Sequence, residues 1–228
     1  MPDQLRIYAL RIPSYISDHQ LEALFHQVTP ERQAKARRFV KKADTLRSLT
    51  AELLLCRVAL PRAGIEAAFP LFIYNQYGKP SLAHNPDIHF NLSHSGQLVV
   101  CAVDSLPVGI DVEEIQPIDI GIARNCCTQE ELAWLEASKE EDRLRHFYDL
   151  WTIKESYVKA KGKGLSCPLN SLKIHKNEDG QMAIFSVSEK WFFRQYQIDN
   201  CYGLSVCASH GNFPIDVLWV DLRELTKV

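Results

Sequence analysis

The chain has 228 residues and a formal net charge of −2, from 26 Lys and Arg residues against 28 Asp and Glu residues. That balance excludes a nucleic-acid binder that is basic along its whole length, and 46% hydrophobic with 24% charged residues excludes disordered, collagen-like and coiled-coil proteins. A chain of this length buries roughly 70% of its unfolded surface, so we expect one or two domains that fold without the help of disulfides or bound metal ions.

The longest uninterrupted apolar run, Leu98 to Val103, is far too short to cross a bilayer, which takes about 20 residues. The first residues carry Asp3 and no apolar signal core, so we expect no secretory leader, no membrane contact and a cytoplasmic location. The seven cysteines include no C-x-x-C pair, which favours reduced thiols over disulfides or a zinc site.

Two helices are predicted near the start of the chain. Ser17 and Gln20 match a capping box, which begins a short amphipathic helix. Thr29 and Pro30 are typical of the first residues of a second helix, which we expect to continue to Pro61. Its later part carries an apolar stripe, and its first turns are strongly basic. The basic residues are Arg32, Lys35, Arg37, Arg38, Lys41, Lys42 and Arg47.

The pattern then changes from helical to period two. Residues 88–92 alternate, residues 98–103 are apolar, and residues 108–112 alternate again, which together predict a meander of three short strands. The residues between the second and third of these strands, 104–107, form the expected turn between two halves of the chain.

The second half repeats the order of helices followed by strands. Thr128 and Glu131 match another capping box, and a long helix is expected from Glu141 to Lys161, ending at Gly162. Later strands are expected around 172–174, 185–187, 204–208 and 217–220. This order is compatible with two similar α+β subdomains packed tightly together, and the default place for a site is the cleft between them.

Two clusters carry carboxylates. Asp111 and Glu113 lie two residues apart on a predicted strand, so they project from one face roughly 6.5–7 Å apart, close enough to reach one hard cation. Glu155 and Lys159 share a face of the predicted long helix, and Glu155 would supply a third carboxylate. Taken alone, a solvated acidic strand and an i, i+4 surface salt bridge explain these residues as well.

Two further motifs contain groups that suit phosphate. Ser93 and His94 lie in F-N-L-S-H-S at a strand end, where a hydroxyl and an imidazole can bind phosphate oxygens. They are a poor nucleophile and base pair, because adjacent side chains of an extended segment point to opposite faces. Lys79 lies in the turn Y-G-K-P, which alone is typical of a surface loop.

Four motifs occur in a fixed order along the chain: Y-G-K-P, F-N-L-S-H-S, G-I-D-V-E and W-T-I-K-E-S-Y-V-K-A-K-G-K-G-L. In these motifs and their order, the chain resembles the surfactin-type (Sfp-type) 4′-phosphopantetheinyl transferases over nearly its whole length. The resemblance implies an α/β (α+β) fold of two similar, pseudo-twofold-related subdomains, acting as a monomer with coenzyme A in the cleft between them. The corresponding subdomains are residues 1–105 and 106–228.

The same resemblance implies a role for each motif residue. Mg²⁺ would be held by Asp111, Glu113 and Glu155. Coenzyme A would be contacted by Arg32, Lys35, Ser48, Lys79, Ser93, His94 and Lys159. Relatives commonly have Lys and Thr where this chain has Arg32 and Ser48, which leaves the positive charge and the hydroxyl in place.

The implied reaction moves 4′-phosphopantetheine from coenzyme A to a serine of an apo acyl or peptidyl carrier protein and releases adenosine 3′,5′-bisphosphate. Glu155 is the candidate base, with Glu113 as the competing choice, and Lys159 would offset developing charge. Residues 164–191 match the family's carrier-docking region, and a basic and apolar surface near Lys161, Lys163, Leu165 and Leu169 would suit the carrier, although the leucines could equally belong to the core.

Two other functions stay open from the sequence. A Mg²⁺-dependent nucleotide phosphohydrolase would use the same three carboxylates and release product without a carrier protein. A non-enzymatic nucleic-acid binder would use the basic helix, and its affinity would fall steeply with salt. The resemblance favours the transferase and predicts no nucleic-acid partner.

Overall fold

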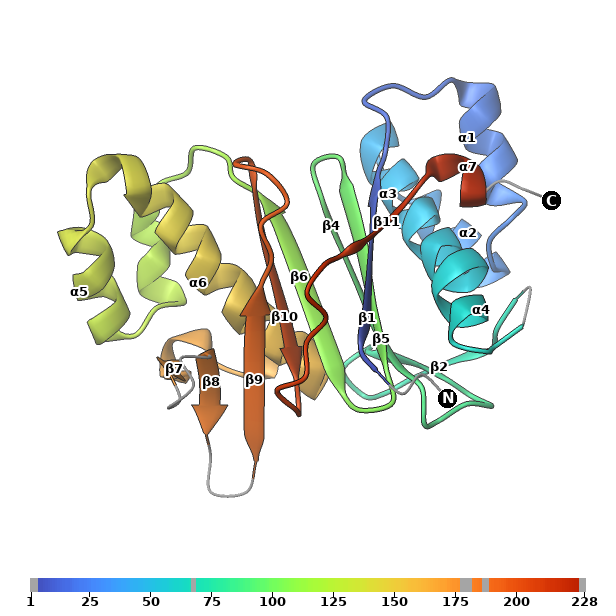
Figure 1. Ribbon diagram of the computed structural model, residues 1–228. Coiled ribbons are helices and arrows are strands. Elements are labelled where there is room, and N and C mark those ends of the chain that lie inside the picture. The colour runs from blue at the N-terminus through green and yellow to red at the C-terminus, as the bar shows by residue number, and fades with distance from the viewer. Residues whose placement is uncertain (1–3, 67–68, 177–181, 186–188, 226–228) are drawn as a thin grey trace.

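Two β-sheets meet face to face at the centre of the molecule, and helices cover both outer faces (Figure 1). The computed structural model describes residues 4–66, 69–176, 182–185 and 189–225. Each half thus places helices outside a sheet that is antiparallel except for one parallel pair in the first sheet, as expected for an α/β fold of two similar halves. The predicted fold class is confirmed.

The first sheet has the strand order β11–β1–β5–β4. Its strands are β1 (Arg6–Arg11), β4 (His89–Ser95), β5 (Leu98–Asp104) and β11 (Leu218–Val220). Strand β5 is apolar without alternation because both its faces are covered. Val99 and Cys101 face the helices, whereas Leu98 and Val100 face the second sheet.

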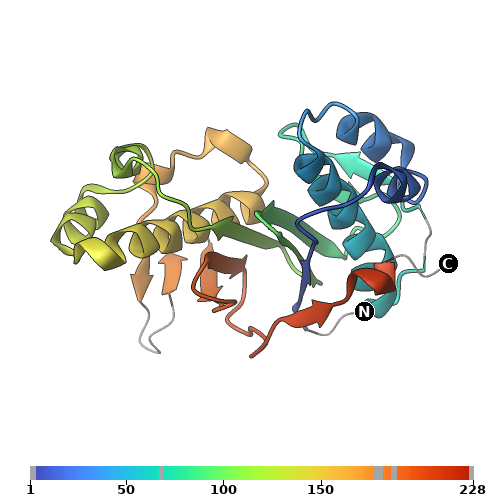
Figure 2. The same ribbon diagram turned by 90° about the horizontal axis from the view of Figure 1, so that it is seen from above.

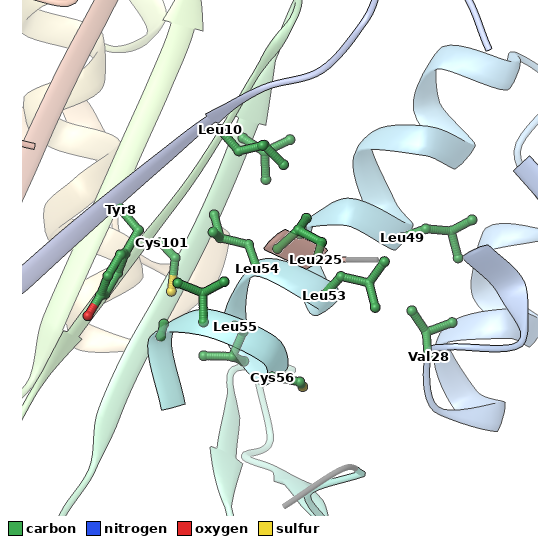
Figure 3. Packing of buried hydrophobic residues seen from close by; sticks show 14 of the residues in the cluster. Tyr8, Leu10, Val28, Leu49, Leu53, Leu54, Leu55, Cys56, Cys101 and Leu225 are labelled. Carbon is green, nitrogen blue, oxygen red and sulfur yellow. The ribbon is translucent and has the colours of Figure 1, made fainter. Parts of the chain in front are cut away.

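Helices α1 (Asp18–Phe25), α2 (Pro30–Ala36) and α3 (Lys42–Leu53) cover the outer face of the first sheet, and α3 continues as a π-helical segment η1 (Leu54–Ala59) and the short α4 (Leu60–Arg62). Figure 3 shows how Leu49, Leu53 and Leu54 point into the core that they share with Tyr8 and Leu10 of β1. The capping boxes predicted at Ser17 and Thr128 are both present.

The long basic helix predicted from Thr29 to Pro61 is wrong in one respect, because it is broken at residues 37–41. Those five residues are exposed, so no burial of an apolar face holds them in a helix. The break lets α2 fold back against α3. In a continuous helix, Arg32 and Glu52 would lie about 30 Å apart at 1.5 Å per residue; here they form an ion pair.

The second sheet has the strand order β6–β10–β9–β8–β7. Its strands are β6 (Val108–Glu114), β7 (His175–Lys176), β8 (Met182–Phe185), β9 (Lys190–Gln195) and β10 (Tyr202–Ala208). Its helices are α5 (Gln129–Ala137) and α6 (Glu140–Lys161), and α6 ends at Gly162 in the left-handed conformation, as predicted. The three remaining short turns of helix are η2 (Ile120–Asn125), η3 (Gly164–Ser166) and η4 (Leu169–Ser171).

The predicted three-strand meander is also corrected, because its third strand, β6, belongs to the second sheet. Strand β4 pairs with β5, whereas β6 pairs with β10. Side chains of β4 join the two sheets instead: Asn91 Oδ1, Ser93 Oγ and Ser95 Oγ accept hydrogen bonds from the backbone N–H groups of residues 110, 112 and 114. These three side chains satisfy the free edge of β6 at the boundary between the halves.

The end of the chain returns to the first half. Figure 2 shows β11 and the short α7 (Leu222–Leu225) crossing to the side of the N-terminal helices, and β11 runs parallel to β1. The boundary between subdomains at 105 and 106 stays a prediction. The strand expected around 185–187 is described only to Phe185, because Val187 lies outside the described residues.

Two further observations concern the cysteines and the helices. All seven cysteines are free thiols, and five of them are buried. Across the described ranges, none of the helices has the length and apolar character needed to cross a membrane.

Candidate functional site

A pocket of about 470 Å³, called here the central pocket, opens where the two halves meet. Helix α2, strands β4 and β6, and helix α6 each contribute to its wall. The expected site residues that line it are Arg32, Lys35, Ser93, His94, Asp111, Glu113, Glu155 and Lys159. Lys79 lines a smaller adjoining pocket of about 320 Å³, the side pocket, which shares Asn91, Glu155 and Lys159 with the central one.

A close approach of α6 to β6 brings the carboxylates together. A Cβ placed on Gly109 would lie 2.0 Å from the Ser156 carbonyl oxygen and 2.4 Å from the Ala160 backbone nitrogen. Only glycine leaves room for the helix there. Asp111 and Glu113 therefore share the central pocket with Glu155 from α6. Their i, i+2 spacing predicted only that the first two share a face.

Asp111 is the most tightly held of the three carboxylates. Its Oδ1 accepts a hydrogen bond from Lys159 Nζ at 2.6 Å and one from Ser93 Oγ at 3.0 Å, and Lys159 also donates to Ser93 at 2.9 Å. The residue is only 2% exposed, and burial raises the pKa of its carboxyl group despite the neighbouring ammonium group. Lys159 thus offsets the charge of Asp111 and makes no ion pair with Glu113 or Glu155.

Glu113 and Glu155 have less compensation. Glu113 accepts one hydrogen bond from Ser95 Oγ at 2.7 Å. Burial, followed by the negative charge of Asp111, raises the pKa of both glutamate side chains. Their ionised forms are therefore disfavoured in the free protein, as expected for acids grouped without enough positive charge.

The acidic end of the pocket suits a hard divalent cation chemically. Asp111 Oδ2 is buried and has no hydrogen-bond partner among the described residues, although a buried carboxylate oxygen normally has one. A cation would satisfy that atom and offset the repulsion among the three acids. Within the described part of the chain, no three His, Cys, Asp or Glu side chains are already arranged to hold a metal ion.

The basic end of the pocket is internally satisfied. Arg32 donates from Nε to Glu52 Oε2 at 2.9 Å and from Nη1 to Ser48 Oγ at 3.3 Å. Glu52 is 3% exposed, and its other oxygen accepts the backbone N–H of Thr29 at 2.7 Å. Ser48 does not line the pocket itself; it lies behind Arg32 and holds the guanidinium in place.

Lys35 and His94 complete the basic end. Burial, followed by the positive charge of Arg32, lowers the pKa of Lys35. His94 lines the pocket and is an exposed residue of β4, yet the surrounding protein removes part of the hydration of its ring. This desolvation, with the positive charges of Arg47 and Lys159, lowers the pKa of His94 to about 4. His94 is therefore neutral at pH 7 and offers one donor and one acceptor.

Lys79 does not point its ammonium group into open space. Its Nζ donates to the backbone carbonyls of Lys159 at 2.6 Å, Ala160 at 2.8 Å and Val108 at 3.2 Å. Burial lowers the pKa of this lysine to about 8. The stem of the side chain lines the side pocket, and its charged end binds the end of α6.

Several supporting residues were not predicted from the sequence. Glu52 anchors Arg32, Ser95 holds Glu113, and Asn91 helps to join β4 to β6. The period-two pattern Asn91-x-Ser93-x-Ser95 was a usable signal, because it places three hydrogen-bonding side chains on one face of β4. Glu52 gave no signal, since a carboxylate in a helix is usually solvated.

Comparison with known proteins agrees with this arrangement. Residues 16–106 match the family described as "4′-phosphopantetheinyl transferase, N-terminal", and residues 107–215 match the "4′-phosphopantetheinyl transferase superfamily". The chain is 36% identical over 223 residues to the 4′-phosphopantetheinyl transferase Sfp of Bacillus subtilis, covering 97% of this chain and 100% of that protein.

A second relative, the 4′-phosphopantetheinyl transferase gsp of Aneurinibacillus migulanus, is 41% identical over 181 residues, covering 79% of this chain and 75% of that protein. Among solved structures, a holo-(acyl-carrier-protein) synthase from Bacillus anthracis covers 45% of this chain and 93% of its own, with a TM-score of 0.40 and 16% identity; so partial a likeness adds nothing to the assignment. The two sequence relatives are similar over most of their length, and the chain belongs to the Sfp-type 4′-phosphopantetheinyl transferases.

Proposed function

We propose that this chain transfers the 4′-phosphopantetheine group of coenzyme A to a serine hydroxyl of an apo acyl or peptidyl carrier protein, with Mg²⁺, and releases adenosine 3′,5′-bisphosphate. The family assignment supports transfer of phosphopantetheine from coenzyme A to carrier proteins. The observation that carries the residue roles is that one pocket has a basic end and an acidic end. Coenzyme A likewise carries a 3′-phosphate at one end of its nucleotide and a pyrophosphate at the other.

The basic end suits the 3′-phosphate. Arg32 presents a guanidinium group fixed by Glu52 and Ser48, so little side-chain entropy is lost when a phosphate binds. Lys35 adds a compact charge, and neutral His94 adds a hydrogen-bond donor. Ser93 would also contact the 3′-phosphate, and Lys159, which is bonded to Asp111 and Ser93, suits the pyrophosphate together with His94.

The acidic end suits Mg²⁺, which Asp111, Glu113 and Glu155 would hold. Bound there, the ion supplies positive charge opposite the pyrophosphate oxygens. The support from this chain is that the buried Asp111 Oδ2 has no hydrogen-bond partner in the described ranges and that the pKa of all three acids is raised.

The chemical step is a substitution at the β-phosphorus. The serine oxygen forms a new bond to that phosphorus, and the bond from phosphorus to the bridging pyrophosphate oxygen breaks. The electron pair leaves with adenosine 3′,5′-bisphosphate, and the serine proton passes to Glu155 directly or through water, with Glu113 as the competing base. A raised glutamate pKa favours this acceptance, and Lys159 offsets charge on the leaving side.

The direct test is mass spectrometry of an apo carrier protein incubated with this protein, coenzyme A and Mg²⁺. We expect the mass of the carrier to increase by one phosphopantetheine group. We expect no such increase for a carrier in which the serine is replaced by alanine. No gain on apo acyl, peptidyl and aryl carriers would contradict the proposal.

The comparisons support neither alternative function. The basic segment also argues against a nucleic-acid surface, because four of its seven cations have acidic partners within the protein. Those pairs are Arg32 with Glu52, Arg37 with Glu22, Lys42 with Asp18, and Arg47 with Asp44.

Three further expectations stay predictions. They are a monomer, a cytoplasmic location, and carrier docking along residues 164–191. Within that region Leu169 is partly buried against two hydrophobic clusters, so it contributes to the core and offers little surface to a carrier. Lys161, beside it in the proposed surface, pairs with Glu189 and lies over the ring of Trp191.

A further inference from the structure

The loop between β2 (Phe72–Tyr74) and β3 (Pro80–Leu82), which comes from the first half, holds the end of α6, which belongs to the second. Lys79 Nζ donates to the Lys159 and Ala160 carbonyls, and Asn75 Nδ2 donates to the Gly162 carbonyl at 2.8 Å. The loop itself is fixed by Asn75 Oδ1, which accepts the backbone N–H groups of Tyr77 and Lys79, both at 2.9 Å.

These contacts supply what a helix end lacks. The last four carbonyls of an α-helix have no partner within the helix, and the end carries a partial negative charge that attracts cations. At the end of α6 the Gly162 N–H satisfies the Val158 carbonyl, and Lys79 satisfies the next two. The helix end is therefore completed by a side chain from the other half of the molecule.

The third hydrogen bond of Lys79 gives this contact a functional meaning. It goes to the carbonyl of Val108, the first residue of β6. One ammonium group thus joins the strand that carries Asp111 to the helix that carries Lys159. We infer that Lys79, oriented by Asn75, is a positioning residue for the transfer reaction: it fixes α6 against β6 and so holds Lys159 beside Asp111 and Ser93.

The surrounding packing leaves little room for another arrangement. A Cβ on Gly162 would lie 2.7 Å from Lys79 Cδ and 3.1 Å from Asn75 Nδ2, and Gly109 is pressed against Ala160 from the other side. The last turn of α6 is thus enclosed between β6 and the loop. Without the hydrogen bonds from Lys79, the backbone of Lys159 in this last turn is no longer held in place. A displacement of about 1 Å near reacting groups costs as much as a hundredfold in rate.

This inference rests on the proposed function, and it differs from a direct role for Lys79 in coenzyme A binding. A group that binds substrate equally in the ground and transition states changes KM, whereas one that positions a transition-state contact changes kcat. The informative variant is Lys79→Met, which keeps the apolar stem beside the side pocket and removes the ammonium group.

We expect Lys79→Met to lower kcat for carrier modification by about 10- to 100-fold while changing KM for coenzyme A by less than about threefold. Backbone amides in the last turn of α6 should exchange with deuterium faster in the free protein. Asn75→Asp keeps the acceptor for Tyr77 and Lys79, removes the donor to Gly162 and places a negative charge at the end of the helix, so it should show the same pattern. Lys139→Met, at the exposed opposite end of α6, is the matched control and should leave both measurements unchanged.

A raised KM with unchanged kcat in Lys79→Met would overturn the inference and assign Lys79 to ligand contact. Unchanged kcat and unchanged amide exchange would also overturn it. If Lys79→Met does not fold, Asn75→Asp decides the matter alone by the same two measurements. Failure of the proposed function would give a different result. The wild-type protein would then modify no carrier, while the amide-exchange comparison would still report on the contact of Lys79 and Asn75 with the end of α6.

Discussion

The two ends of the central pocket are built in opposite ways. At the basic end, Arg32 is already paired with Glu52 and bonded to Ser48, and Thr29 completes the cluster. At the acidic end, Lys159 pairs with Asp111 but not with the other two carboxylates, and Asp111 Oδ2 is buried with no hydrogen-bond partner among the described residues. The basic end is preorganised, whereas the acidic end is under electrostatic strain that a cation would relieve.

This difference separates what each end contributes. A preorganised phosphate site binds substrate at low entropic cost but lowers KM more than it raises kcat. A strained cluster of acids costs stability and is retained where it takes part in chemistry. Substitutions at the acidic end should therefore change catalysis most, and those at the basic end should change substrate affinity.

The largest effect is expected from Glu155→Ala. Loss of the candidate base and a proposed cation ligand together should abolish carrier modification, with a fall of at least about 10³-fold in the single-turnover rate. Glu141→Ala, an exposed substitution in the first turn of the same helix, is the control and should retain the wild-type rate. An unchanged rate in Glu155→Ala would remove Glu155 from the mechanism.

Lys159→Ala should slow transfer by about 10²-fold, because it removes a positive side chain that contacts Asp111 and would offset developing charge. The same variant should also raise the concentration of Mg²⁺ needed for half-maximal rate less than Glu155→Ala does, since Lys159 is not a proposed ligand. Single-turnover kinetics over a Mg²⁺ series measure both quantities. A wild-type rate would show that the acidic end needs no cation from α6.

The strain at the acidic end makes a prediction about stability that needs no activity. A carboxyl group whose pKa is raised on folding makes its full contribution to stability below its pKa in the unfolded chain, near 4.5 for Glu. That contribution is lost as the pH rises through the pKa of the group in the folded protein. At pH 7 the metal-free protein bears that cost. Glu113→Gln and Glu155→Gln should therefore each raise its Tm, by about 2–4 °C per kcal/mol relieved.

Thermal unfolding at pH 7 in the presence of a chelator measures this effect, and repetition at pH 4 should make the difference from wild type shrink. Addition of Mg²⁺ should raise the Tm of wild type more than that of either variant, because binding to the folded state stabilises it. A lower Tm for both variants without metal would mean that the acids are already compensated.

Local elements of this molecule were predictable, and pairings between distant segments were not. The capping boxes at Ser17 and Thr128 and the helix end at Gly162 are formed by hydrogen bonds within a few residues, so their sequence signals suffice. The placement of β6 in the second sheet depends on β10, about 90 residues later, and no local pattern distinguishes it from a third strand of a meander.

The site shows the same division. The i, i+2 spacing of Asp111 and Glu113 fixed their shared face, and the structure brings them to Glu155 as expected. The break between α2 and α3, which brings Arg32 to Glu52, has no such signal, because it reflects a lack of burial at residues 37–41. Nor does the direction of Lys79 follow from its turn, since its acceptors are carbonyls of α6 and β6.

The smallest expected effect concerns His94, and it tests the basic end. Its pKa is lowered from 6.5 to about 4 by desolvation and by neighbouring cations, so the free protein should lose stability as pH falls from 6.5 toward 4, where only the unfolded chain takes up the proton. A bound phosphate dianion reverses that balance, because it places negative charge beside the imidazole.

Adenosine 3′,5′-bisphosphate should therefore raise the NMR titration midpoint of His94, and near pH 6 its binding should be accompanied by proton uptake that calorimetry in two buffers detects. His94→Gln should remove that uptake and weaken binding only modestly, since Arg32 and Lys35 remain. A midpoint that the ligand does not move would mean that the phosphate does not reach His94, and the preorganised end of the pocket would then consist of Arg32, Lys35 and their supports alone.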